Sequence, residues 1–401
     1  MVGVSGSFGA IRPRPAPLQE LGGLASGGLD ALYASDLVAE VRTLAWLVNS
    51  SCDLACTHCY YQVANGYRQS ELLSEDEHRK LLHEAAAAGI SRIGLIGKEP
   101  LLPGAAGADR TLSLLRSIAD LETQDGPLKT SLVTHGMRLG EVTDELASAG
   151  LHELHVSFDG AASVDHERIR GPKTFGRAIE GLMVALERAA AERVVASFTL
   201  HTHNLAGLAE MFGWAERYGV QHFTLSPYMP QAGGPARLES RSLKQMLTET
   251  LPNAAKRLAT TRALSLTIDI DADVLYADAR DYARVFASSV LLDVSGLPFL
   301  QTQIGPVEVT LRIHLPAPLG GLGAISHDGY YFDRHPIYWL QKDYRRRASA
   351  NLRERSLVEA VTTHRQRNRD LRPLAHGLLH SDHALHRRPE GTPATSLAEL
   401  P

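Results

Sequence analysis

The sequence predicts an α/β fold built on a parallel sheet that is open or barrel-like. From about residue 42, short apolar runs alternate with longer amphipathic stretches, which gives six βα units in series. The 401 residues are enough to bury a large core, and 44% hydrophobic with 21% charged residues is ordinary for a globular protein. In folds of this kind, the residues that bind and react usually lie in the loops that follow the carboxyl ends of the strands.

Each predicted strand is a short apolar run followed by turn residues. The six runs are Thr43–Val48, Arg92–Ile96, Lys129–Val133, Leu154–Phe158, Val194–Leu200 and His222–Leu225. The stretches between them are predicted helices, and the clearest begins after Ser74. Ser74 and Glu77 have the spacing of a capping box, an apolar stripe follows, and Gly89 ends the pattern.

Composition divides the chain into four parts. Residues 1–36 are rich in Gly, Pro, Ala and Ser and predict a flexible arm, and residues 37–230 hold the six βα units. Residues 231–375 have a different rhythm and predict a C-terminal α+β cap, and the His-, Arg- and Pro-rich residues 376–401 predict a disordered tail. Within the cap we expect a helix at Leu238–Leu258, a strand at Leu264–Ile270, a hairpin of Pro306–Leu315 with Leu322–Phe332, and a helix near Ser356–Arg367.

The net charge of −4 gives no electrostatic argument for a nucleic acid or an anionic membrane as a partner. No apolar run approaches the roughly 18 residues that a membrane span needs. The N-terminus lacks the pattern of a secretory signal, and three cysteines are an odd number for a disulfide framework. We therefore expect a cytoplasmic protein.

All three cysteines lie in one short segment: Cys52, Cys56 and Cys59 have the spacing C-x3-C-x2-C, directly after the first predicted strand. A closed zinc site would need a fourth ligand, and His58 is awkward in that role because it adjoins Cys59. A [4Fe–4S] cluster held by three thiolates would leave one iron open to an external ligand. The remaining alternative is three unrelated buried cysteines.

This triplet after a first strand resembles the signature of the radical S-adenosylmethionine (SAM) superfamily. The resemblance implies an incomplete parallel (β/α)6 barrel, one [4Fe–4S] cluster held by Cys52, Cys56 and Cys59, and SAM bound to the open iron. In that family, one electron cleaves SAM and the resulting 5′-deoxyadenosyl radical takes a hydrogen atom from the substrate. It also implies an electron donor of flavodoxin or ferredoxin type.

Further segments match the family motifs in order along the chain. Gly97-Lys98-Glu99-Pro100 resembles Gly-Gly-Glu-Pro, Thr134-His135-Gly136 resembles Thr-Asn-Gly, and Ser157-Phe158-Asp159-Gly160 resembles Ser-Ile-Asp-Gly. His166–Gly171 resembles a His-Asp-x-x-Arg-Gly segment. The cofactor contacts that this resemblance implies are Gly97, Glu99, Pro100, Thr134, Ser157, Arg168, Arg170, Thr199, Asn204 and His58.

Two residues are candidates to act on the substrate. Lys98 replaces the second Gly of the family motif and would project a cation toward the substrate, although a solvated or Glu99-paired side chain is the alternative. Asp159 often faces the substrate in the family. Arg170 is the best candidate to pair with the SAM carboxylate, and Arg168 is the second candidate.

Two short segments, 324–334 and 351–360, resemble the SPASM-type extension of peptide- and sugar-modifying relatives, but the cysteines of that extension are absent. An unrelated cap is the alternative. Without further cysteines, these residues can build no auxiliary cluster and supply no thiol that returns hydrogen. The expected substrate is a peptide or another natural-product intermediate. The alternatives are an aminosugar or nucleoside altered by elimination, decarboxylation or rearrangement, and a non-catalytic iron–sulfur or zinc protein.

Overall fold

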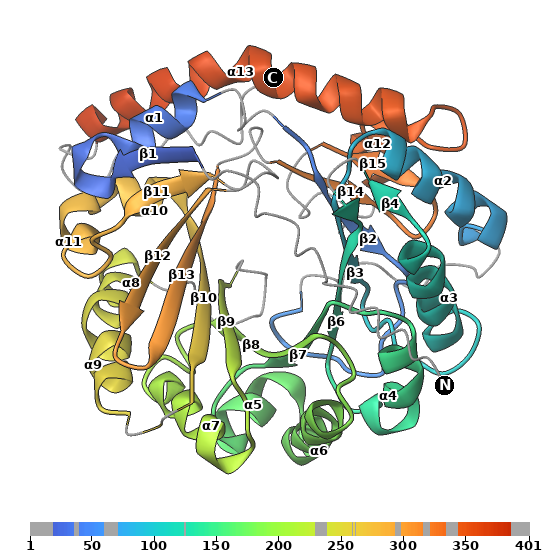
Figure 1. Ribbon diagram of the computed structural model, residues 1–401, viewed down its shortest axis with the longest axis horizontal. Helices are drawn as coiled ribbons and strands as arrows, with labels where there is room; N and C mark the ends of the chain where they lie inside the picture. Colours follow the sequence, from blue (N-terminus) through green and yellow to red (C-terminus); the bar gives the residue numbers. More distant parts are fainter. Residues whose placement is uncertain are drawn as a thin grey trace, which may run out of the picture.

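The computed structural model describes residues 19–35, 40–59, 71–123, 126–228, 239–258, 260, 262–292, 298–315, 321–333 and 344–385. A single curved sheet of 14 strands forms the centre of the molecule, and most helices lie on its outer side (Figure 1). The strand order is β1-β11-β12-β13-β10-β9-β8-β7-β6-β3-β2-β14-β15-β16. The sheet is mostly parallel and does not close on itself, which confirms the predicted incomplete barrel.

The six predicted strands lie side by side at the middle of this sheet, and all are parallel. They are β2 (Thr43–Leu47), β3 (Arg92–Ile96), β6 (Lys129–Thr134), β7 (Glu153–Phe158), β8 (Arg193–Leu200) and β9 (His222–Pro227). Because the strands are parallel neighbours, their carboxyl ends meet at one edge of the sheet. The loops that carry the predicted motifs therefore share that edge.

The helices between these strands cover the outer face. They are α2 (Glu75–Ala87), α3 (Ala108–Ala119), α4 (Leu139–Ser148), α5 (Ser163–Arg170), α6 (Thr174–Glu187) and the short η5 (Leu208–Gly213) with α7 (Trp214–Arg217). A small hairpin of β4 (Glu122–Thr123) and β5 (Gly126–Pro127) precedes β6. The capping box of Ser74 and Glu77 is confirmed at the start of α2.

Side-chain alternation separates the two faces of the sheet. In β7, Leu154, Val156 and Phe158 are buried in the core, whereas His155 and Ser157 are half-buried on the opposite face. A period of two is the expected pattern for strands with one face under helices. The apolar face packs under the helices, and the inner face of the arc carries polar side chains.

The described strands of the C-terminal region extend the same sheet at both of its ends. On the β9 side, β10 (Leu264–Asp271) and β13 (Val307–His314) continue in parallel, followed by the antiparallel β12 (Pro298–Ile304) and β11 (Ser289–Leu292). On the β2 side, β14 (Leu322–Ile325) is parallel to β2, and β15 (Tyr330–Phe332) and β16 (Ala350–Asn351) follow antiparallel. The remaining helices of this region are α8 (Ser240–Gln245), η6 (Met246–Thr250), α9 (Leu251–Lys256), α10 (Ala272–Ala277), α11 (Ala279–Ala283) and α12 (Tyr344–Arg347).

The predicted hairpin of Pro306–Leu315 with Leu322–Phe332 is wrong. The first segment contains β13, which pairs with β10 and β12, whereas the second contains β14 and β15, which pair with each other at the far end of the sheet. Two neighbouring apolar runs separated by Pro and Gly resemble a hairpin in the sequence. The pairing is decided instead by the open sheet edges, since β13 pairs with β10 and β14 pairs with β2.

The predicted flexible arm is also wrong for residues 19–34, while residues 1–18 and 36 lie outside the described residues. Gln19–Gly23 forms β1, which pairs antiparallel with β11. Leu24–Ser26 (η1) and Gly28–Ala34 (α1) follow, and Leu29 and Leu32 are buried in the main core. These apolar side chains anchor a segment whose Gly and Ala content predicted disorder.

The last described helix, α13, spans Leu357–Leu385 and contacts both α1 and α2 (Figure 1). It contains residues 376–385, so the predicted disordered tail is wrong there, and residues 386–401 lie outside the described part. Two side chains of α13 bind the rest of the protein: Arg365 donates a hydrogen bond to the carbonyl of Val41, and His364 shares one with the Tyr331 hydroxyl. None of the described helices combines the length and the apolarity that a bilayer span requires.

Candidate functional site

The three cysteines lie in the loop after β2, at the carboxyl edge of the sheet. Cys56 is buried, and Cys52 and Cys59 are half-buried. The loop is held from outside, because the Thr57 N–H donates to the carbonyl of Ile169 in α5 at 2.9 Å. Burial raises the pKa of the Cys52 thiol to about 12 and that of Cys56 to about 11. A bound metal centre would reverse this preference, since it holds its thiol ligands deprotonated.

The donor set suits an iron–sulfur cluster better than a single zinc ion. Thiolates around one tetrahedral Zn²⁺, each about 2.3 Å from the metal, lie about 3.8 Å apart. Among the described residues, the one group of three or more His, Cys, Asp or Glu ligand atoms within 4.8 Å of one another is Cys52 with Asp53 and His135. At least two of the three cysteine sulfurs are therefore more than 4.8 Å apart. A cluster that places each thiolate on a different iron accommodates that wider spacing.

Glu99 forms hydrogen bonds that link the segments after β2, β3 and β6. Its side chain is fully buried, and its carboxylate accepts hydrogen bonds from the Thr134 hydroxyl at 2.6 Å, the His135 N–H at 2.8 Å and the Leu101 N–H at 2.9 Å. The Glu99 N–H in turn donates to the carbonyl of Ser51, next to Cys52. The Glu-containing motif after β3 is therefore joined to both the cysteine loop and the end of β6.

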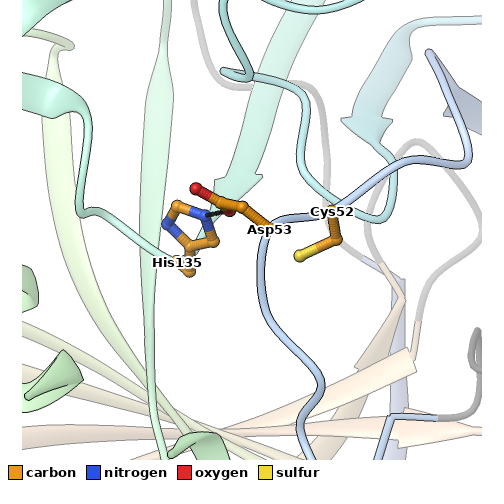
Figure 2. A group of neighbouring side chains, drawn as sticks. All are labelled: Cys52, Asp53 and His135. Carbon is orange, nitrogen blue, oxygen red and sulfur yellow. Dashed lines mark hydrogen bonds and ion pairs between the residues drawn. The ribbon is translucent and has the colours of Figure 1, made fainter. Parts of the chain in front are cut away.

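His135 links the end of β6 to the cysteine loop. Its Nε2 lies 2.8 Å from Oδ1 of Asp53, which adjoins Cys52 (Figure 2). Arg138 contacts the other oxygen of Asp53 at 3.3 Å. Burial alone would raise the pKa of Asp53, but the hydrogen bond and charge of His135, together with Arg138, lower it below its usual value. His135 thus has a definite partner at a position where the family motif has Asn.

Asp159 and Arg170 form a buried ion pair beneath the cysteine loop. Asp159 has no exposed surface, and the Arg170 Nε donates to its Oδ2. Burial alone would raise the pKa of Asp159, but the charges of Arg170 and His58 lower it well below its usual range. The pKa of Arg170 is raised by Asp159 and also by its proximity to Cys56 and Cys59, despite the opposing effect of burial. A permanent cation therefore lies beside two of the predicted cluster ligands.

The side chain of His58 contacts Asp159, which argues against a role for His58 as a metal ligand. Its Nε2 lies 3.2 Å from the Asp159 Oδ1, and its ring packs near His201 and Tyr228. His201 is completely buried, and burial lowers its pKa to about 4. His58 thus connects Cys59 to the ends of β7, β8 and β9.

The side chain of Asn204 forms hydrogen bonds with backbone groups at the ends of β7 and β8. Its side-chain amide donates to the carbonyls of Asp159 at 3.1 Å and Thr199 at 2.6 Å, and its oxygen accepts from the His201 N–H. These contacts use most of its hydrogen-bonding capacity, so the predicted contact of Asn204 with adenosine stays a prediction. The predicted catalytic role of Asp159 also stays a prediction, because its carboxylate is buried.

The other predicted residues occupy the same edge of the sheet with different exposure. Gly97 lies so close to Asn49 that a Cβ there would be 3.1 Å from the Asn49 side-chain oxygen. The carbonyl of the buried Pro100 accepts from the Thr111 hydroxyl. Lys98 is half-buried, as are Ser157 and Thr199 on the inner face, whereas Arg168 is exposed on α5.

Two residues of the network were not predicted from the sequence. Asn49 donates to the carbonyls of Glu99 and Ala106, and its side-chain oxygen accepts from the Ser51 N–H. Asp53 binds His135 and Arg138. The available signals were a polar residue two positions after β2 and a carboxylate between two cysteines, and neither residue type has a fixed role without the fold.

Comparison with known proteins agrees with this geometry. Residues 46–215 match the family model described as the radical SAM superfamily. The chain is 30% identical over 195 residues to the AdoMet-dependent heme synthase of Methanosarcina barkeri (strain Fusaro / DSM 804), covering 48% of this chain and 52% of that protein. It is 27% identical over 209 residues to the GTP 3′,8-cyclase of Sinorhizobium medicae (strain WSM419), covering 50% and 57%. The chain thus spans about half the length of these relatives.

Solved structures resemble more of the chain. Streptococcus suis SuiB bound to S-adenosylmethionine has a TM-score of 0.59 at 13% identity and covers 80% of this chain and 65% of that one. Native anSMEcpe with bound AdoMet and Cp18Cys peptide has a TM-score of 0.55 at 14% identity and covers 83% of both chains. At these identities the likeness concerns the fold. The segment that matches the radical SAM superfamily, residues 46–215, contains the cysteine triplet, and enzymes of that superfamily use a [4Fe–4S] cluster and SAM.

Proposed function

We propose that this chain is a radical SAM enzyme that abstracts hydrogen from an unactivated C–H bond of a peptide or another natural-product intermediate. One observation carries the proposal: hydrogen bonds and ion pairs join the cysteine loop to the Glu99, His135 and Asp159 loops at one edge of the sheet. Bound at that edge, a [4Fe–4S] cluster with SAM supplies the electron and the 5′-deoxyadenosyl radical for the reaction.

The residues of the chain have positioning roles in this proposal. Cys52, Cys56 and Cys59 hold the cluster. Arg170 offsets part of the negative charge that the thiolates bring, because a cation stabilises buried anions at short range. Asp159 fixes the guanidinium by accepting from its Nε. Glu99, oriented by the Thr134 hydroxyl, presents the carboxylate that we propose for the SAM ammonium.

The core of the proposed enzyme is residues 37–230, and residues 231–375 are the proposed C-terminal extension. SuiB bound to the precursor peptide SuiA covers 80% of this chain, and anSMEcpe with a bound peptide covers 83% of it, which supports a peptide substrate. The name of the GTP 3′,8-cyclase relatives favours a second candidate, a nucleoside or aminosugar intermediate. Three free thiols suit a reducing cytoplasm as the place of action and a flavodoxin or ferredoxin as the electron donor.

Anaerobic reconstitution tests the proposed function. With iron and sulfide, we expect about four irons per chain and, on adding dithionite and SAM, formation of 5′-deoxyadenosine measured by mass spectrometry. Cys56→Ala should lose both. A cluster without SAM cleavage, or one tightly bound zinc per chain, would point to the non-catalytic alternative. Stimulation of SAM cleavage by peptide pools or by nucleotides then separates the two substrate classes.

A further inference from the structure

A second polar cluster lies on the inner face of the sheet, where β9, β10 and β13 run side by side (Figure 1). The cluster consists of Ser226, Asp269, Arg312 and His314, and we call it the Asp269 cluster. The residues next to Asp269 and Arg312 along their strands, Ile268 and Leu311 among them, are buried in the main core under the helices. Because side chains alternate along a strand, the Asp269 cluster faces the interior of the arc.

Asp269 is the centre of this cluster. Its Oδ1 accepts from the Arg312 Nε at 2.8 Å and lies 3.0 Å from the His314 Nε2, and its Oδ2 accepts from the Arg312 Nη2 at 3.1 Å and the Ser226 hydroxyl at 2.6 Å. Burial alone would raise the pKa of Asp269, but the charges of Arg312 and His314 lower it well below its usual range. The charged carboxylate therefore holds the guanidinium of Arg312 by one edge.

This contact leaves the outer edge of the Arg312 guanidinium available. Asp269 takes one N–H of Nε and one of Nη2, and among the described residues nothing accepts from Nη1. Nη1 and the second N–H of Nη2 form a planar fork, which a carboxylate or a phosphate matches with two parallel hydrogen bonds. The Arg312 side chain is 37% exposed and that of Asp269 is 10% exposed, so a ligand can reach the fork but not the acid behind it.

The charges around this fork favour a ligand with a single negative charge. Asp271 is in register with His314, so two acids accompany the two bases at this point of the sheet. The charge of Asp269 raises the pKa of Arg312 against the opposing effect of burial, and Glu153 adds to that rise. Glu153 is itself paired with Arg193 at 3.2 Å. A phosphate monoester carries about −1.5 to −2 charge at neutral pH, so these nearly neutral surroundings suit a carboxylate better.

Strand register places the fork near the edge of the sheet that carries the cysteine loop. Thr199, a predicted cofactor contact at the end of β8, is in register with Ser226, and Asp269 is in register with Arg312. The hydrogen bond from Ser226 to Asp269 joins the two pairs. Thr199 and Arg312 are thus three strands apart, which is about 14 Å along the sheet. An extended peptide of about four residues spans that distance.

We propose that the outer edge of Arg312 binds a carboxylate of the substrate and anchors it while a carbon nearer to Thr199 reacts. The inference rests on the proposed function, because it names the group by which the same enzyme recognises its substrate. In this assignment Arg312 determines specificity, and Asp269 is a positioning residue that fixes the guanidinium. The expected substrate is a peptide with an acidic side chain or a free C-terminus, in preference to a nucleotide.

Matched probes test the anchor. Two capped pentapeptides of alanine carry a central Glu or a central Gln, and UMP with uridine forms the second pair. Binding to the reconstituted full chain is measured by calorimetry with SAM present and no reductant. We expect the Glu peptide to bind at least about tenfold more tightly than the Gln peptide, and UMP to gain less than about threefold over uridine.

Arg312→Lys keeps the charge but loses the fork, so its preference for the Glu peptide should fall below about threefold. Arg193→Lys is the matched control, since Arg193 is also paired with an acid, and it should keep the tenfold preference. Absent or equal binding of the two peptides to the wild type, or a larger gain from the phosphate than from the carboxylate, would overturn the inference.

A second measurement uses the wild type alone and so does not depend on the folding of a variant. Phenylglyoxal modifies accessible guanidinium groups, and mass spectrometry of proteolytic fragments follows Arg312 and Arg193 separately. The Glu peptide should slow the modification of Arg312 at least about threefold and leave that of Arg193 unchanged, whereas an unprotected Arg312 would contradict the assignment. Failure of 5′-deoxyadenosine formation with dithionite would instead refute the proposed function. The binding measurements require no SAM cleavage and would still decide the carboxylate site.

Discussion

Nε2 of His135 lies 2.8 Å from Oδ1 of Asp53, so the end of β6 is bonded directly to the loop that carries the cysteines. Nδ1 of the same ring accepts from the Met137 N–H at 3.2 Å. His135→Asn should keep the turn, because an Asn oxygen can accept from the N–H two residues on, but it should lose the bond to Asp53.

We expect His135→Asn to fold normally and to release iron several times faster than the wild type from the reconstituted protein, measured with a chromogenic chelator under anaerobic conditions. Asp53→Asn should have a similar effect, and the double variant should be no worse than either single variant. Independent, additive effects of the two substitutions would show that the contact does not stabilise the cysteine loop.

Arg170 and Arg168 should behave very differently, although both were candidates for the same role. Arg170→Gln leaves the fully buried Asp159 without its cation, which typically costs about 3–5 kcal/mol. Arg168 is exposed, so Arg168→Gln should change the free energy of unfolding by less than about 0.5 kcal/mol. Urea unfolding of the cluster-free protein measures both, and equal destabilisation by the two variants would contradict the assignment of the ion pair to Arg170.

Two glycines of α6 allow a controlled comparison, because a side chain would clash at one of them and meet nothing at the other. A Cβ at Gly181 would lie 1.9 Å from the carbonyl oxygen of Gly136, whereas a Cβ at Gly176 would meet nothing within 4 Å. Gly181→Ala should therefore destabilise the protein by about 2–3 kcal/mol, because α6 must move away from the Thr134-His135-Gly136 loop. Gly176→Ala should stabilise it by about 0.5 kcal/mol. Thermal unfolding checks both, and a tolerated Gly181→Ala would show that the loop can shift.

His78 should make stability depend on pH. It is buried beside Trp46 and Arg110, and burial, aided by the charge of Arg110, lowers its pKa from 6.5 to about 3. Between these values the unfolded chain binds a proton that the folded chain does not, so stability is lost as the pH falls from 6.5 toward 3. For this residue alone the loss at pH 5 is about 2 kcal/mol.

The measurement for His78 is urea unfolding of the cluster-free protein at pH 7 and pH 5. His78→Gln should reduce the difference between the two pH values by about 2 kcal/mol. His83→Gln is the control, since His83 lies exposed on the same helix, and it should leave the difference unchanged. An unaltered pH dependence in His78→Gln would mean that the folded protein admits a charged imidazole at this position.

The sequence was sufficient for the βα core because each strand there pairs with a neighbour in a repeated, local pattern. Predicted and observed strands agree within two residues at every end, and the capping box at Ser74 was correct. The C-terminal strands were different, since β13 and β14 are close in sequence but join opposite ends of the sheet. Pairing of that kind depends on which edges remain open, which no short segment encodes.

The candidate site was predictable to a similar degree. Motif order identified the loops that meet at the edge of the sheet, but it gave no information about which side chains bind one another. Arg170 was expected to contact SAM, yet it donates to Asp159, and the use of His135 became clear only with Asp53 beside it. These partners are 11 and 82 residues apart in the sequence, so they meet only in the folded chain.

Helix α13 spans the distance between the two ends of the curved sheet (Figure 1). At 29 residues it is about 44 Å long, and it contacts α2 beside the β2 end and α1 beside β1 at the other end. The two ends of the arc cannot separate unless one of these contacts breaks, so the width of the interior is fixed by the last helix of the chain. In the proposed enzyme, spreading of the arc to admit a bulky substrate would therefore require α13 to lose its contacts with α1 or with α2.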